Sequence, residues 1–157
     1  MQWIVSREEL SIREKKMISS EKVMITVFGN PKKIVLVDAL PKGEKLNSFY
    51  YTNNILEKLH NLGSGFPDTN RKKLNVHADN ARTHTSKTTI RYMETHGMKK
   101  VLHPAFLPDL APSDFFLFRY VKKLLGGQSF TTREELFQEV SQILYGISVE
   151  VLKRAFF

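Results

Sequence analysis

The chain has 157 residues, which suits one domain with one core, and 41% of them are hydrophobic, which excludes a disordered protein by composition. Its 24 Lys and Arg residues outnumber 16 Asp and Glu residues, so the net charge is +8. That charge favours a polyanionic partner such as nucleic acid, although a merely basic soluble protein is an equally good interpretation. The absence of cysteine excludes disulfides and thiolate metal sites. No apolar run approaches the roughly 20 residues of a membrane helix, so no membrane partner is expected.

The first half of the chain predicts an arm, a hairpin and a helix. Residues 1–21 are polar, with charges clustered between residues 7 and 16, and we expect them to form an irregular arm. Residues 23–28 and 34–40 are rich in β-formers and flank the turn sequence Gly29-Asn30-Pro31-Lys32, which predicts a β-hairpin. Asn47 fits the N-cap of a helix over residues 48–59.

The second half alternates short strands with helices. The predicted elements are a strand over residues 74–77, a helix over 86–96 ended by Gly97, a strand over 100–102, a helix over 114–125 capped by Ser113, a helix opened by the capping box of Thr132 and Glu135, and a last helix over 149–157. A strand pair followed by this alternation predicts an α/β fold, with a mixed sheet flanked by helices on both faces. No repeat or linker interrupts the chain, so residues 1–157 are expected to form a single domain.

Two aspartates lie in unusual local sequences. Asp79 follows the apolar strand over residues 74–77, and Asp114 ends a proline-rich run and opens an apolar helix. Carboxylates at the end of a strand and the start of a helix can share a hard cation such as Mg²⁺. Such cations drive phosphoryl transfer on nucleic acids. A complete site of this kind needs a third carboxylate upstream.

Each candidate residue also has a structural interpretation. An aspartate at a strand end is more often a turn-former, and Asp114 could simply stabilise a helix N-terminus. Asn80 and Arg82 could contact phosphate or hold the loop, and the residue types do not separate these roles. His77 and His84 flank Asp79, but no further ligands accompany them, so their spacing does not indicate a zinc site.

Two motifs resemble those of one enzyme family. Residues 77–84, His-Ala-Asp-Asn-Ala-Arg-Thr-His, resemble the H-x-D-N-A-R-x-H motif of the mariner transposases in the Tc1/mariner superfamily. Residues 103–118 are similar to the family's H-P-x-x-S-P-D-L-A-P-S-D-x-x-L-F, with Leu107 in place of the usual serine. The thirty-four residues between Asp79 and Asp114 equal the family's spacing between its second and third catalytic aspartates. With weaker likenesses upstream, the resemblance covers nearly the whole chain.

The resemblance implies an RNase H-like fold that holds two Mg²⁺ or Mn²⁺ ions on three carboxylates. Asp79 maps onto the second catalytic, metal-binding aspartate and Asp114 onto the third. Asn80, Arg82 and His84 become candidates for DNA contact or loop ordering. The implied function is DNA transposition in the nucleus, with endonuclease cleavage and strand transfer at transposon ends. The implied partners are DNA and either a second copy of the chain, as a homodimer, or a full-length transposase subunit.

The sequence departs from the family pattern at its start. The family's first catalytic aspartate lies on the first strand in a D-E-x-W-like motif, and the 157 residues contain no such motif. Residues 1–3, Met-Gln-Trp, look like a family segment downstream of it. We therefore expect a truncated catalytic domain that lacks its first strand and has impaired activity. That strand would lie between the hairpin and the Asp79 strand. We expect either that residues 2–5 pair with its neighbours and fill part of the gap, or that the isolated chain is poorly stable.

Other functions are also compatible with these differences from the family pattern. The family's N-terminal helix-turn-helix domains, which read transposon ends, are also missing from the sequence. The chain could then be a domesticated, non-catalytic module that binds DNA or a transposase subunit. It could equally be the product of a decayed transposon without a function.

Overall fold

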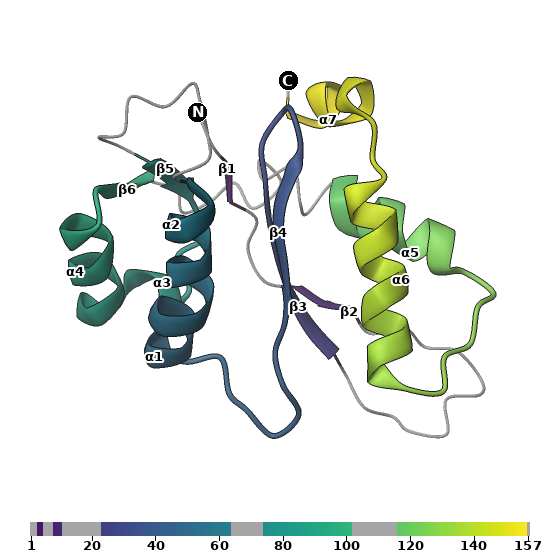
Figure 1. The fold of residues 1–157 in the computed structure, drawn as a ribbon, viewed down its shortest axis with the longest axis horizontal. Helices are drawn as coiled ribbons and strands as arrows, with labels where there is room; N and C mark the ends of the chain where they lie inside the picture. Colours follow the sequence, from purple (N-terminus) through teal and green to yellow (C-terminus); the bar gives the residue numbers. More distant parts are fainter. Residues whose placement is uncertain (1–2, 5–7, 11–22, 64–73, 102–115, 157) are drawn as a thin grey trace.

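A computed structural model describes residues 3–4, 8–10, 23–63, 74–101 and 116–156 of the chain. The described elements are, in chain order, β1 (Trp3–Ile4), β2 (Glu8–Leu10), β3 (Val23–Gly29), β4 (Ile34–Ala39), α1 (Ser48–Tyr50), the π-helical segment η1 (Tyr51–Leu56), α2 (Glu57–Gly63), β5 (Leu74–His77), α3 (Arg82–Thr85), α4 (Lys87–Thr95), β6 (Met98–Val101), α5 (Phe118–Leu125), α6 (Arg133–Tyr145) and α7 (Val149–Phe156). The long hairpin of β3 and β4 stands at the centre, with α1, α2 and α4 on one side and α5, α6 and α7 on the other (Figure 1). This is the expected mixed α/β arrangement.

The central hairpin forms where the sequence predicts it. Strands β3 and β4 pair antiparallel, with Val27 opposite Val37. The side chain of Asn30 closes the turn, because its Oδ1 accepts hydrogen bonds of 2.8 Å from the backbone N–H groups of both Lys32 and Lys33. An asparagine that binds its own neighbouring backbone in this way fixes the turn and therefore the register of the strands.

Two short strands from the N-terminal arm cover the second edge of β3. Ile4 of β1 lies opposite Phe28, and Glu8 of β2 lies opposite Ile25. Because β4 already pairs with both Phe28 and Ile25, the arm must lie on the other edge of β3. The arm over residues 1–21, expected to be irregular, thus contains the short strands β1 and β2. The reason is that the edge of β3 needs hydrogen-bond partners wherever it is buried.

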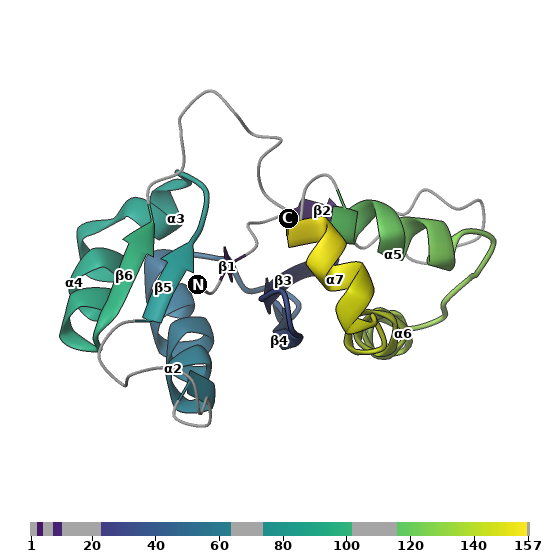
Figure 2. The same cartoon turned by 90° about the horizontal axis from the view of Figure 1, so that it is seen from above.

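Strand β1 also lies between the two sheets. Strands β5 and β6 form a separate parallel pair, in which Val76 lies opposite Lys100. Strand β1 lies beside β5 as well as β3, between the hairpin and the parallel pair (Figure 2). The expectation that residues 2–5 pair within this gap is therefore confirmed at Trp3 and Ile4, the two residues of that segment that the structure describes.

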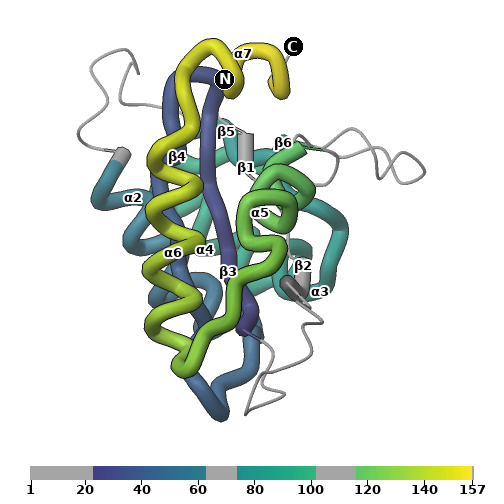
Figure 3. Tube along the Cα trace, turned by 90° about the vertical axis from the view of Figure 1, so that its right-hand side faces the viewer, coloured from purple at the N-terminus to yellow at the C-terminus, as the bar shows by residue number. Residues whose placement is uncertain are grey.

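The hairpin separates two hydrophobic clusters. Ile25 and Val27 point toward α5, α6 and α7, whereas Phe28 points toward η1, α2 and α4, as the alternation of a strand requires. Helices α5 and α6 lie side by side over one face of the hairpin (Figure 3). The first cluster contains Val23, Ile25, Val27, Ile34, Val37, Leu117, Phe118, Val121, Leu125, Leu136, Val140, Leu144, Ile147 and Leu152. The second contains Phe28, Leu36, Tyr51, Ile55, Leu56, Leu59, Val76, Ala78, Met93 and Met98.

The helices differ from their predicted bounds in several places. Helix α6 begins as its capping box predicts, since Thr132 Oγ1 accepts a 3.1 Å bond from the N–H of Glu135. The predicted start of α5 at Asp114 lies outside the described residues. The predicted helix over residues 48–59 contains the π-helical segment η1 and runs on to Gly63. None of the helices within the described residues is long and apolar enough to cross a membrane.

Candidate catalytic site

Asp79 lies where the sequence predicts, just beyond the C-terminal end of β5. Strand β5 ends at His77, and the buried Ala78 brings the chain to Asp79, whose side chain is partly exposed. In a parallel pair both C-terminal ends meet at one edge, so the end of β6 lies beside this position. Asp114 lies outside the described residues. Whether the two carboxylates share an ion therefore stays a prediction.

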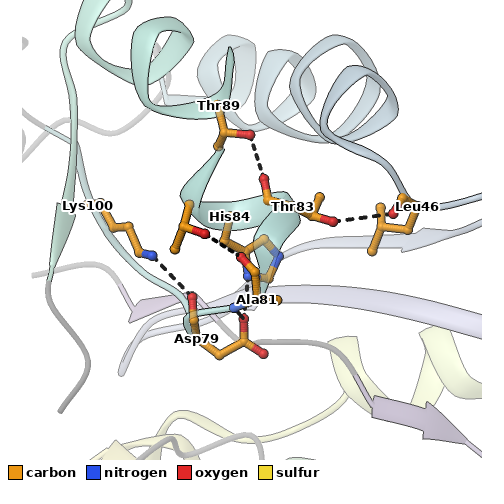
Figure 4. Close-up of polar contacts among 8 residues, drawn as sticks. Leu46, Asp79, Ala81, Thr83, His84, Thr89 and Lys100 are labelled. Carbon is orange, nitrogen blue, oxygen red and sulfur yellow. Dashed lines mark hydrogen bonds and ion pairs between the residues drawn. The ribbon is translucent and has the colours of Figure 1, made fainter. Parts of the chain in front are cut away.

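One oxygen of Asp79 is held by two donors. Its Oδ1 accepts a 3.0 Å hydrogen bond from the backbone N–H of Ala81 and lies 2.6 Å from Nδ1 of His84 (Figure 4). An ionised carboxylate can only accept, so Nδ1 of His84 carries the proton in this pair. The other oxygen, Oδ2, receives no hydrogen bond from the residues that the structure describes. The carboxylate is therefore oriented with one oxygen left for a ligand.

The short helix α3 presents His84 to the carboxylate. Ala81 has extended dihedrals (φ −56°, ψ 145°), so the chain turns sharply into α3 and brings His84 back toward Asp79. The His84 ring is buried and packs against the buried ring of Tyr51, with centroids 4.6 Å apart. The negative charge of Asp79 adds to burial in raising the pKa of Tyr51, so this phenol stays neutral. His84 is thus placed to order the loop, one of the two roles considered for it.

Threonine hydroxyls fix α3 from two sides. Thr83 Oγ1 donates to the carbonyl of Leu46 at 3.3 Å, which ties α3 to the segment before α1. Thr89 Oγ1 donates to the carbonyl of Thr83 at 2.6 Å, which ties α3 to α4 (Figure 4). Ser86 caps α4, and its hydroxyl oxygen accepts a 3.1 Å bond from the Thr89 N–H. The predicted helix begins at residue 86, so the sequence does not predict α3. The hydroxyl contacts that hold α3 join residues from three separate elements, and a local sequence pattern does not reveal them.

The Asp79 carboxyl is held in its ionised form. Burial by itself raises its pKa, but the hydrogen bonds from His84 and Ala81, with the nearby charges, outweigh that effect and leave the pKa below its ordinary value. A carboxylate that is ionised and oriented at neutral pH is suited to a hard cation.

Lys100 is the residue that the sequence interpretation missed. It lies on β6, and its Nζ donates a 3.2 Å hydrogen bond to the backbone carbonyl of Asp79 (Figure 4). Burial lowers the pKa of Lys100, and the negative charge of Asp79 opposes that shift. No motif marks this lysine, because the contact depends on the pairing of β5 with β6. Only that pairing could have revealed it.

The other candidate residues flank the carboxylate. Asn80 and Arg82 are exposed on either side of Ala81, where both are open to solvent. Their roles in DNA contact or loop ordering stay predictions. His77 is buried at the end of β5.

Asp79 fits one part of a divalent-metal site. It supplies an ionised, oriented oxygen ligand of the kind Mg²⁺ and Mn²⁺ prefer. Among residues 23–63, 74–101 and 116–156, no three His, Asp or Glu side chains converge on one ion position. The second predicted ligand, Asp114, lies outside these segments.

Comparison with known proteins finds transposases among the sequences that are similar to this chain. A family model described as "Transposase (partial DDE domain)" matches residues 1–71. The human histone-lysine N-methyltransferase SETMAR is 29% identical over 144 residues, which are 88% of this chain and 21% of SETMAR. The mariner Mos1 transposase of Drosophila mauritiana is 29% identical over 119 residues, 74% of this chain and 34% of that protein. The chain thus spans about a third or less of the length of these curated relatives.

Solved structures share the fold. The catalytic domain of Mos1 mariner transposase matches 98% of this chain with a TM-score of 0.80 and 22% identity, and 74% of that domain is covered. A Mos1 paired-end complex with Mg matches 99% of this chain with a TM-score of 0.82 and 21% identity, and 51% of that chain is covered. These matches bear out the RNase H-like α/β fold. The match to the Mos1 transposase confirms the resemblance to mariner transposases, and the family model adds a transposase match over residues 1–71.

Proposed function

We propose that these 157 residues form part of a mariner-type transposase catalytic domain, whose ancestral reaction is metal-dependent cleavage and transfer of DNA strands at transposon ends in the nucleus. The observation that carries the proposal is the position of Asp79. It follows a parallel strand of a transposase-like fold, ionised and oriented by His84 and Ala81, with Oδ2 left for a ligand. The +8 charge supports DNA as the partner.

Within this function, the residues around Asp79 do the positioning. Asp79, with Asp114, would hold Mg²⁺ or Mn²⁺, which when bound supplies activation of a water or 3′-hydroxyl and stabilisation of the leaving oxygen. His84 and Ala81 keep the Asp79 carboxylate from rotating, and Thr83 and Thr89 keep His84 in place. Such fixed geometry matters because metal ligands misplaced by about 1 Å can cost roughly a hundredfold in rate.

We further propose that these residues by themselves cleave DNA poorly. The family pattern uses three carboxylates, and the 157 residues contain matches to only the second and third, Asp79 and Asp114. Two carboxylates hold a divalent ion less tightly than three and leave the nucleophile less well positioned. The alternative function is a non-catalytic module that binds DNA or a transposase subunit, including a second copy of the chain, and the excess of basic residues favours it.

A nicking assay on supercoiled plasmid tests the proposal of impaired cleavage. The chain is compared with Asp79→Ala and Asp114→Ala, each with Mg²⁺, with Mn²⁺ and with EDTA. We expect no metal-dependent nicking above the EDTA control in any of the three proteins. Nicking by the wild-type chain that both substitutions abolish would show that two carboxylates suffice, and would overturn the proposal of impaired cleavage while supporting the metal site.

A further inference from the structure

Lys100 places a positive charge beside the backbone of Asp79, the residue that the proposed function takes as a metal ligand. Its Nζ lies 3.2 Å from the backbone oxygen of Asp79, and its side chain reaches this position from the neighbouring strand β6 (Figure 4). The contact is partly buried, so the side chain is held rather than free in solvent. An ammonium donates to a neutral carbonyl here, close to the Asp79 carboxylate, while Oδ1 of that carboxylate is already bound by His84.

Two consequences follow from a lysine in this position. Its charge already offsets part of the negative charge of Asp79, which is the charge that would attract a divalent ion. The same charge repels any divalent ion that binds to Oδ2. The repulsion acts in a partly buried place, where solvent screens it less than at an open surface.

We propose that Lys100 is a resident cation of the Asp79 site and weakens the binding of divalent metal ions there. This inference rests on the proposed function, because it takes Asp79 to be a metal ligand. If it holds, the low cleavage activity expected of the chain has two causes: the charge of Lys100 on β6 and the number of carboxylates. Coulomb repulsion between a single and a double charge about 7 Å apart, at the dielectric constant of water, corresponds to roughly a tenfold loss of metal affinity.

The strand provides a matched control for this effect. Lys99 precedes Lys100 on β6, is exposed, and points to the opposite face of the strand. Lys99→Met and Lys100→Met therefore remove the same charge from adjacent positions, and only the second removes it from beside Asp79. Lys100→Gln removes the charge but keeps a polar donor, which guards against a loss of stability in the methionine variant.

The test is titration of each protein with Mn²⁺, with free Mn²⁺ measured by electron paramagnetic resonance and folding checked by circular dichroism. We expect Lys100→Met and Lys100→Gln to bind Mn²⁺ about tenfold more tightly than wild type, and Lys99→Met to match wild type. Adding Asp79→Asn to Lys100→Met should remove the gain. Unchanged or weaker Mn²⁺ binding by both Lys100 variants, or an equal gain in Lys99→Met, would overturn the inference.

The outcome also separates this inference from the proposed function. If wild type binds Mn²⁺ in a way that Asp79→Asn abolishes, but the Lys100 variants bind no better, the metal site stands and the role of Lys100 is wrong. If no variant binds Mn²⁺ through Asp79, both fail. Should the Lys100 variants lose affinity for duplex DNA while their Mn²⁺ affinity stays at the wild-type value, the ammonium is a phosphate contact and the inference is overturned.

Discussion

The imidazole of His84 holds the carboxylate of Asp79, with Nδ1 2.6 Å from Oδ1. The histidine side chain is 5% exposed and the aspartate side chain 36% exposed, so a buried, fixed donor orients a group that solvent and ligands can reach. A charge-assisted bond of this kind is stronger than one between neutral groups. Because His84 packs against the buried ring of Tyr51, the hydrophobic core fixes the position of the carboxylate.

Substitution of His84 tests this orientation. His84→Leu should raise the pKa of Asp79 and lower the free energy of unfolding by about 1–3 kcal/mol, because a hydrogen bond to a charged group is lost. His84→Asn is the matched variant, since its amide nitrogen occupies a place close to Nδ1 and can still donate. It should keep the pKa of Asp79 low. Carbon-13 titration of the Asp79 carboxyl and urea denaturation provide the measurements. Equal pKa values in the two variants would contradict the orienting role.

The lowered pKa of Asp79 also predicts how stability depends on pH. Because the folded-state pKa lies below the unfolded value of about 3.9, the ionised carboxylate stabilises the fold above that value. This contribution is lost as the pH falls through the folded-state pKa. Asp79→Asn removes it, so the stability difference between wild type and the variant should be largest at neutral pH and shrink below about pH 4. Thermal melts of both proteins from pH 7 to pH 3 measure this stability difference. A difference that grows as the pH falls would contradict the prediction.

The parts of the fold that the sequence predicts are those set by local chemistry. Strand β5 has its predicted bounds, Leu74 to His77, and α6 begins at its capping box. The sequence does not predict β2. Glu8 and Glu9 are charged and only Leu10 is apolar, and the strand pairs because β3 offers a free edge. Likewise, nothing in residues 51–56 marks the π-helical segment η1, which packs in the second hydrophobic cluster.

The candidate site also has a part that the sequence predicts and a part that it does not. Motif and spacing identify Asp79, because a carboxylate after a buried strand has a recognisable local sequence. Its partners are set by tertiary structure. His84 reaches it through the turn at Ala81, and Lys100 reaches it across the β5–β6 pairing, twenty-one positions later in the chain. Residue type alone leaves a lysine on a short strand indistinguishable from any solvated lysine.

Pairing of β1 with β3 predicts a local effect of proline. Ile4→Pro removes the backbone N–H of a residue that pairs with Phe28, whereas Ile4→Ala keeps it. Neighbouring residues of a strand direct their N–H groups to opposite edges. We therefore expect faster deuterium exchange in the proline variant at whichever of the Phe28 and Gly29 amides faces β1, and a smaller change in the alanine variant. Exchange along β4 should change less, because β4 lies on the other edge of β3. Identical exchange in both variants would mean that β1 does not protect this edge.

A buried aspartate outside the site forms an ion pair, so substitutions of its two partners should have coupled effects on stability. Asp38 on β4 is 8% exposed at its side chain and lies 2.6 Å from Nζ of Lys58, whose side chain is 52% exposed. Tyr50 adds a 3.3 Å hydrogen bond from its hydroxyl, and burial together with the charge of Asp38 raises the pKa of Tyr50 to about 12.

Lys58→Met should therefore destabilise the fold by roughly 1–3 kcal/mol, because it leaves a buried carboxylate without its cation. Adding Asp38→Asn should recover part of that loss, since the amide carries no charge to be stranded. Urea denaturation of the two single variants and the double variant gives the coupling energy. Strictly additive effects would show that the pair does not interact in solution.

Binding to DNA is the last prediction, and it follows from charge. With a net charge of +8 and no helix-turn-helix motif in its sequence, the chain should bind duplex DNA weakly and without sequence preference. Affinity should fall steeply with salt, with a slope of about −0.9 in log–log terms for each phosphate contacted. Fluorescence anisotropy on a mariner-type transposon end and on a shuffled duplex, from 50 to 200 mM salt, measures both. Preference for the transposon end, or affinity that salt leaves unchanged, would show that the chain reads DNA by more than its charge.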